Sequence, residues 1–404
     1  MLLLVACGGA STGDSGTDTT VDAPATTSET TTTTSEPATT LEPPTADLPE
    51  GELPDGPSAL RDRDNPEFPP ALVPISEIRS GGPPPDGIPS IDDPKFRSIE
   101  EADTSLTDDE PVVALEIDGD ARAYPIEIMI WHEIVNDTVA DVPVTVTYCP
   151  LCNSAISYER TINGVETTFG TSGSLFASAL VMYDRATESL WTHFDGKAVV
   201  GVLAGERLTP VPSPLLSWGD FKEAYPDGQV LSRDTGFNRN YGQNPYFGYD
   251  NPDTSPFLFR GDVDERARAK QRVAGVSIGD DSVAFSIEAI SGGDAKATNT
   301  EVSDHPVVLF WSAGQSSALE GANTDDGRDV GSVGVFDPRV DGDLLTFEAD
   351  GDAFVDEQTG STWDITGRAT GGELEGTQLE KIPHLDTFWF AWSTYQPGTT
   401  LVEA

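Results

Sequence analysis

From about residue 112 onward, short runs of alternating hydrophobic and polar residues predict a protein built mainly of β-strands. Val112–Ile117 and Val142–Tyr148 both alternate with a period of two, which is typical of a strand with two different faces. Dipeptides that favour tight hairpin turns separate such runs along the chain. They are Asp118-Gly119, Asn163-Gly164, Asp341-Gly342 and Asp350-Gly351.

Three short segments have the spacing of helices instead. One begins after Ser217, with Trp218 and Phe221 at helical spacing, Asp220 as a partner resembling a capping box, and Pro226 as its stop. We expect such aromatic residues to belong to the core, and the whole to be a β-rich α+β fold. The other two segments are Thr387 to Gln396, with Trp389 and Trp392, and Pro125 to Asp137, with Ile126, Ile130 and Ile134 on its buried face.

The globular part of the sequence also repeats itself. Val112–Ile117 returns as Val273–Ile278 at an offset of 161, and later motifs return at offsets up to 172. Among these, Asp184 and Trp191 match Asp356 and Trp363. Because order and spacing agree over so long a stretch, we predict an internal duplication with two pseudo-symmetric lobes, 112–231 and 273–402, each closing on a short helix.

The beginning of the chain resembles a bacterial or archaeal lipobox, because Leu4-Val5-Ala6-Cys7 is followed by small residues. In such signals the cysteine is lipidated. The apolar run is too short for a complete signal, so we expect that the natural signal starts earlier. Residues 1–45 then form this start and a disordered Thr/Ser-rich spacer. The sequence predicts an exported protein, lipid-anchored through Cys7 on the outer face of the cytoplasmic membrane.

Two further segments flank the first lobe. Residues 46–110 are rich in proline, which favours an extended arm around the core over a separate domain. Residues 232–272 form an aromatic connector between the lobes. Two roles are open for its aromatic residues: Tyr241, Tyr246 and Tyr249 line a ligand cleft, or they attach the connector to the lobe surface.

The charge of the chain excludes some partners. The chain has 69 acidic and 23 basic residues, which gives a formal net charge of -46. The acidic excess extends over the spacer, the arm and both lobes. Such a surface repels nucleic acid and anionic lipid. We therefore expect no nucleic-acid partner, and membrane attachment only through a lipidated Cys7.

Candidate chemistry is concentrated at Cys149 and Cys152, which form a Cys-x-x-Cys motif between two predicted strands. Two sulfur atoms so spaced can bind a metal ion, perform thiol redox chemistry or form a structural disulfide. At the repeat offset of 163, these cysteines align with Ser312 and Gln315. The thiols are therefore specific to the first lobe, whereas a requirement of the fold would recur in both.

Histidines supply candidate third ligands. His132, within the helix predicted from Pro125 to Asp137, is the main one, and His193 is another. Two thiolates and an imidazole suit copper or zinc and not magnesium or calcium. Glu133, Asp137 and Arg185 are expected to support the site by orienting its ligands.

The motifs that surround these residues resemble one family. Trp131-His132-Glu133, Tyr148-Cys149-Pro150-Leu151-Cys152-Asn153 and Val181-Met182-Tyr183-Asp184-Arg185 are similar to the bacterial and archaeal domain of unknown function 3179 (DUF3179). The resemblance implies an exported protein with a Cys-Pro-x-Cys loop and implies no reaction. Two hypotheses follow: a soft-metal or thiol-redox site at Cys149, Cys152 and His132, or a non-catalytic cell-surface binding module with a structural disulfide.

Overall fold

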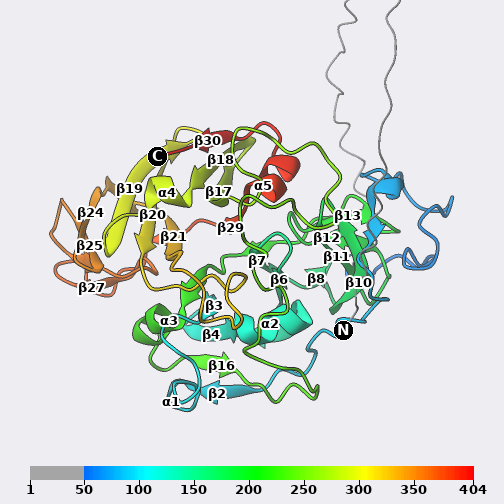
Figure 1. Cartoon of the computed structure of the whole chain (residues 1–404), viewed down its shortest axis with the longest axis horizontal. Helices are drawn as coiled ribbons and strands as arrows, with labels where there is room; N and C mark the ends of the chain where they lie inside the picture. Colours follow the sequence, from blue (N-terminus) through cyan, green and yellow to red (C-terminus); the bar gives the residue numbers. More distant parts are fainter. Residues whose placement is uncertain (1–49) are drawn as a thin grey trace, which may run out of the picture. The chain divides into compact units, whose positions relative to one another are not determined.

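The computed structural model describes residues 50–404, and this part of the chain is rich in β-structure, with 30 strands and five short α-helices (Figure 1). Cys7 and the predicted spacer lie outside the described residues. Within residues 50–404, no helix combines the length and the apolar character needed to span a membrane. The predicted β-rich α+β character is confirmed, and the strands are divided among several small sheets.

Residues 79–231 form three sheets and a small hairpin. The first sheet is ordered β15-β3-β4-β16-β2, the second β14-β7-β6-β5 and the third β1-β10-β11-β12-β13, while β8 pairs with β9. The strands are β1 (Arg79–Ser80), β2 (Phe96–Ser98), β3 (Pro111–Ile117), β4 (Asp120–Pro125), β5 (Ile134–Val139), β6 (Val142–Cys149), β7 (Ser154–Glu159), β8 (Thr161–Ile162), β9 (Val165–Glu166), β10 (Phe169–Phe176), β11 (Ala179–Asp184), β12 (Leu190–Thr192), β13 (Lys197–Val200), β14 (Pro210–Val211), β15 (Leu215–Ser217) and β16 (Gln229–Leu231).

Residues 272–402 form a second series of sheets. Their orders are β29-β17-β18-β30, β19-β20-β21-β28 and β24-β25-β26-β27, and β22 pairs with β23. The strands are β17 (Arg272–Ile278), β18 (Asp281–Ser286), β19 (Ala295–Val302), β20 (His305–Ser312), β21 (Ser332–Asp337), β22 (Arg339–Val340), β23 (Asp343–Leu344), β24 (Phe347–Asp350), β25 (Ala353–Asp356), β26 (Thr362–Trp363), β27 (Ala369–Gly371), β28 (Glu380–Lys381), β29 (His384–Phe388) and β30 (Thr400–Val402).

The helices are all short, and two of them form where the aromatic spacing predicted them. Ser217 caps the helix after β15, because its side chain accepts a hydrogen bond from the Asp220 backbone N–H at 3.0 Å. The aromatic residues on which both helices were predicted are buried, as expected: Trp218, Phe221, Trp389 and Trp392. The helices are η1 (Ile75–Glu77, a 3₁₀ turn), α1 (Ile99–Ala102), α2 (Ile126–His132), α3 (Trp218–Ala224), α4 (Ile287–Ile290) and α5 (Trp389–Tyr395).

The helix predicted from Pro125 to Asp137 is shorter than expected. It ends at His132 because Glu133 adopts the left-handed conformation, with φ at 60°. The following residues leave the helix, so Ile134 is the first residue of β5 instead of the last buried position of α2. The prediction that Ile134 lies on the helix was therefore wrong, although its burial is correct.

The predicted turns connect the strands as expected. Asp118 and Gly119 both have positive φ, 48° and 86°, and join β3 to β4. Asn163 and Gly164 do the same between β8 and β9. Asparagine, aspartate and glycine tolerate positive φ, so these short polar pairs can reverse the chain without disturbing the flanking strands.

The arm and the connector both pack on the sheets. Within the arm, β1 pairs with β10 and β2 pairs with β16, and Ala59 and Leu106 are buried. No helix or strand is formed between Leu231 and Arg272, both of which are described.

The largest hydrophobic core includes residues of the hairpin between β6 and β7 together with residues of β29 and α5, from near the C-terminus. Figure 1 shows β29 beside β7.

Candidate metal centre

The Cys-x-x-Cys motif forms the turn of a β-hairpin, as the sequence predicted. Cys149 is the last residue of β6, and it pairs with Ser154, the first residue of β7. Pro150 fixes one backbone angle of the turn, and Asn153 closes it with φ at 50°. This geometry directs both thiols into the interior, where the Cys149 and Cys152 residues are 2% and 0% exposed.

His193 is brought to this turn by a different sheet. It follows directly after β12, and its backbone N–H donates to the carbonyl of Leu180 on β11 at 3.1 Å. Its side chain is fully buried. One ligand atom from each of Cys149, Cys152 and His193 lies within 4.8 Å of the others, the only such group of three His, Cys, Asp or Glu residues in the described part of the chain.

A serine hydroxyl links the histidine to one thiol. The Ser154 Oγ lies 2.9 Å from the Cys152 Sγ and 2.8 Å from the His193 Nε2. The direct distance between the Cys152 Sγ and the His193 Nε2 is 3.8 Å. The two cysteines are not bonded to each other, so both sulfur atoms remain available as ligands.

Hydrogen bonding on the far side of the ring determines which nitrogen of His193 carries the proton. The Thr147 hydroxyl donates its one proton to the carbonyl of Ile156 at 2.8 Å. It therefore accepts from the His193 Nδ1, which lies 2.9 Å away. The proton must be on Nδ1, and the lone pair of Nε2 then faces Ser154 and the thiols.

Burial keeps this imidazole neutral. It lowers the pKa of His193 to about 3, because a charged ring would lose its hydration in the core. Neutral imidazole is the form that binds metal ions. The ring is thus held in the protonation state and the tautomer that a metal ligand requires.

The two thiols differ from each other. Burial acts to raise the pKa of Cys149, but hydrogen bonds from the Cys152 thiol and from three backbone N–H groups outweigh it and lower the pKa. Burial, followed by the interaction with Cys149, raises the pKa of Cys152. Cys149 is therefore the thiol that more readily becomes a thiolate, the form that binds metal.

Residues near the C-terminus hold the turn in place. The carbonyl of Cys152 accepts from the Thr387 hydroxyl at 2.7 Å and from the Phe388 N–H at 3.0 Å. The Asn153 amide donates to the carboxyl of Asp386 at 3.3 Å. Because β29 supplies all three partners, the cysteine turn is fixed by both halves of the globular part.

His132, the expected third ligand, does not join this cluster. Its Nδ1 lies 2.7 Å from the carbonyl of Pro89 and its Nε2 lies 2.7 Å from the Tyr241 hydroxyl. Both ring nitrogens are therefore engaged elsewhere. Of the two histidines proposed from the sequence, the structure brings His193 to the thiols, because β12 ends beside the hairpin.

The three residues expected to support the site have different positions. The buried carboxyl of Glu133 has its pKa raised by burial and then by interaction with Cys149, so Glu133 lies near the cluster. Asp137 instead pairs with Arg122 at 2.7 Å, and Arg185 pairs with Asp92 at 2.7 Å. These last two residues connect strands and the arm away from the thiols.

The connector tyrosines pack mainly against the core. The rings of Tyr241, Tyr246 and Tyr249 contact the largest hydrophobic cluster. The hydroxyl of Tyr249 donates to the carbonyl of Leu151 in the cysteine turn at 3.0 Å. These contacts agree with the attachment of the connector to the globular part.

Sequence reasoning missed Thr147 and Ser154. A strand places alternate residues on one face, so Thr147 shares a face of β6 with Cys149, two positions later. Ser154 follows Cys152 by two residues and opposes Cys149 in the hairpin. Strand alternation and hairpin register could therefore have indicated both positions, but nothing local indicated that His193 would meet them.

Comparison with known proteins gives a family but no function. Residues 85–399 match the family described as "Protein of unknown function (DUF3179)". The match covers most of the chain, so the chain belongs to this family, in agreement with the motifs quoted above. No curated protein and no solved structure matches the chain.

Proposed function

We propose that this member of the DUF3179 family binds one copper or zinc ion through Cys149, Cys152 and His193. The observation that carries the proposal is the approach of two thiols and one imidazole to within 4.8 Å of one another in the core. Thiolate sulfur and imidazole nitrogen are the ligands that Cu(I) and Zn(II) prefer. Thr147 orients the imidazole as hydrogen-bonded partners commonly do around metal sites.

The donor set distinguishes between the two ions. Structural zinc sites almost always have four ligands, and the cluster offers three His or Cys side chains. Soft Cu(I) is stable with three ligands of this kind. The number of donors therefore favours Cu(I), whereas Zn(II) would need a further ligand such as the Ser154 hydroxyl or water.

Burial favours metal binding over thiol redox chemistry with a macromolecular partner. Thiol exchange requires that a thiolate of one molecule attack a sulfur of the other. With residue exposures of 2% and 0%, neither Cys149 nor Cys152 can meet such a partner without opening of the hairpin. A metal ion can be bound in the interior once its water ligands have been replaced.

We also propose that residues 112–231 and 273–402 are two copies of one unit. In support, Trp191 donates to the carboxylate of Asp184 at 3.0 Å, and Trp363 donates to that of Asp356 at 3.0 Å. Strand pairings agree as well: β3 pairs with β4 and β15, and β17 pairs with β18 and β29.

The comparison of the two units supports a functional role for the cluster. The offset that aligns Trp191 with Trp363 aligns His193 with Ile365. Ser312 and Gln315 take the positions of the two cysteines. All three proposed ligands are therefore missing from the second unit, although its strands form, which argues that the fold does not need them.

Metal content tests the proposal. Purified protein would be loaded with Cu(I) or Zn(II), desalted and measured by inductively coupled plasma mass spectrometry. We expect about one ion per chain, and loss of that ion in Cys149→Ser, Cys152→Ser and His193→Gln. His132→Gln is the matched control, because it alters a buried histidine outside the cluster and should retain the metal.

Two results would overturn this assignment. One is the absence of stoichiometric metal in folded, reduced wild-type protein. The other is full retention of metal by His193→Gln with loss in His132→Gln. Circular dichroism spectra of each variant would separate loss of the site from loss of the fold.

We further propose that the chain is exported and lipid-anchored through Cys7, which belongs to the lipobox-like motif. Expression of the full natural gene in a bacterium fed a radiolabelled fatty acid should label the wild type and leave Cys7→Ser unlabelled. Label in the Cys7→Ser protein, or no label in the wild type, would contradict lipidation at this residue.

A further inference from the structure

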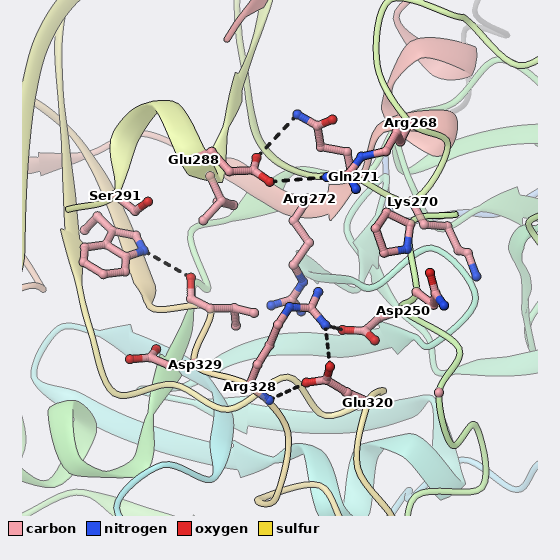
Figure 2. A pocket seen from close by; sticks show the side chains of 16 residues that line it. Asp250, Arg268, Lys270, Gln271, Arg272, Glu288, Ser291, Glu320, Arg328 and Asp329 are labelled. Carbon is pink, nitrogen blue, oxygen red and sulfur yellow. Dashed lines mark hydrogen bonds and ion pairs between the residues drawn. The ribbon is translucent and has the colours of Figure 1, made fainter. Parts of the chain in front are cut away.

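We propose that a second site, a cavity beside the start of β17, binds a small organic molecule that carries one carboxylate. The cavity has a volume of about 590 Å³, a size typical of small-molecule sites. None of its lining residues belongs to the cysteine and histidine cluster. It is bounded by the connector, α4 and the loop between β20 and β21 (Figure 2).

Arg272 is the side chain that indicates a ligand. It is only 6% exposed, yet its Nε and Nη1 atoms have no hydrogen-bond partner. Arg272 forms a long ion pair with the carboxylate of Asp386, which lies 3.9 Å from Nε, and this distance is too long for a hydrogen bond. Buried donors without acceptors are costly, so a ligand that accepts from this guanidinium would be stabilised.

Two further cationic side chains around the cavity, Lys270 and Arg328, already have close partners. Lys270 donates to the carbonyl of Tyr249 and to the Thr254 hydroxyl. Arg328 forms ion pairs with Asp250 at 2.8 Å and with Glu320 at 3.2 Å. Figure 2 shows Arg328 and Arg272 extending toward each other from opposite walls.

The fourth cation lies at the edge of the cavity. The Arg268 side chain is 53% exposed, and its nearest acidic partner in the cavity wall, Glu288, is 3.7 Å away. Arg268 can therefore turn toward an entering anion. Arg272, buried and with unfilled donors, would form the fixed end of the site, and Arg268 would contribute at its mouth.

The remaining lining residues define the class of ligand. The wall also contains carboxylates, among them Glu288 and Asp329, which would repel a doubly charged anion such as phosphate. Ile287, Trp311 and Val330 provide an apolar surface for an organic group. A guanidinium presents paired donors that match the two oxygens of a carboxylate, so a monocarboxylate with an apolar body fits the site best.

Isothermal titration calorimetry at low salt tests this site. The probes are acetate, 4-methylpentanoate and 3-phenylpropionate, compared with the neutral 3-phenylpropanamide and with inorganic phosphate. We expect the larger carboxylates to bind and the amide and phosphate to bind at least tenfold more weakly. Metal-loaded and metal-free protein should behave alike, because the cavity does not share residues with the cluster.

Variants identify the residue responsible. Arg272→Lys preserves the charge but removes the paired donors, and it should weaken carboxylate binding at least tenfold. Arg339→Lys is the matched control, since it makes the same change at a half-exposed arginine paired with Asp337 outside the cavity. Ser291→Phe fills the cavity without altering Arg272 and should also abolish binding.

Three results would contradict a carboxylate site at Arg272. Binding of no carboxylate by the folded wild type would overturn the proposal, and so would equal binding of the carboxylate and its amide. Undiminished binding by both Arg272→Lys and Ser291→Phe would mean that the carboxylate binds elsewhere. Because Ser291→Phe leaves the arginine in place, its result stands even if Arg272→Lys fails to fold.

Discussion

Replacement of Thr147 by valine should weaken metal binding without any change to a ligand. Valine keeps the shape of threonine but cannot accept the hydrogen bond from the His193 Nδ1, now 2.9 Å long. Loss of a partner that orients a metal-binding histidine typically lowers affinity by about 10-fold to 100-fold. This corresponds to about 1.4 to 2.7 kcal/mol of binding free energy. The metal-free protein should also lose about 1 to 3 kcal/mol of stability, because a buried N–H is left without an acceptor.

A competition titration against a coloured Cu(I) chelator would measure the affinity, and urea unfolding would measure the stability. Thr145→Val is the matched control. Thr145 lies on the same face of β6 and is fully buried, but its hydroxyl has no hydrogen-bond partner. Removal of that hydroxyl should leave the affinity unchanged and the stability unchanged or higher. Equal affinities for Thr147→Val and Thr145→Val would refute the proposed control of the His193 tautomer.

Three further predictions concern the stability of the protein. Burial lowers the pKa of His193 from its usual 6.5 to about 3, so between these values the unfolded chain binds a proton that the folded chain does not. In urea unfolding of the metal-free protein, the free energy of unfolding should therefore fall by up to about 1.4 kcal/mol for each pH unit by which the pH is lowered through this range. In His193→Gln, the free energy of unfolding should depend less steeply on pH. Asp184→Asn and Asp356→Asn should each lower the free energy of unfolding by about 1.5 to 3 kcal/mol, because each weakens a hydrogen bond from a buried tryptophan to a charged group. A large loss in only one of the two variants would contradict equivalent roles of Asp184 and Asp356 in the two proposed copies. Trp392→Ala should cost about 3 to 5 kcal/mol in thermal or urea unfolding, because this buried ring packs in the largest core cluster, and a cost below 1 kcal/mol would disprove that role.

Local features of the fold could be predicted well from the sequence. Asp118 and Gly119 tolerate positive φ, so the turn between β3 and β4 needs no information from elsewhere in the chain. Ser217 likewise caps α3 through a contact three residues away. The end of α2 was harder to predict, because Glu133 in the left-handed conformation carries no glycine or asparagine signal.

One part of the candidate site could be predicted from the sequence, and the other part depends on the tertiary structure. The spacing of Cys149 and Cys152 alone placed two sulfur atoms in one turn, because a hairpin of that length keeps its ends together. The third ligand could not be identified from the sequence. His132 lies closer to the cysteines in sequence than His193 does, but its ring nitrogens form hydrogen bonds with Pro89 and Tyr241. His193 reaches the thiols because β12 belongs to a separate sheet that packs beside the hairpin.

The sequence by itself determined what short-range geometry controls, namely strand alternation, tight turns, helix caps and the paired thiols. Only the tertiary structure decided which distant side chains meet, including His193 at the thiols, and it left two donors of Arg272 without hydrogen-bond partners at its cavity. The physical reason is that such contacts depend on how whole sheets pack. That packing is set by the sum of many weak hydrophobic contacts along the chain, and no single motif near Cys149 records it.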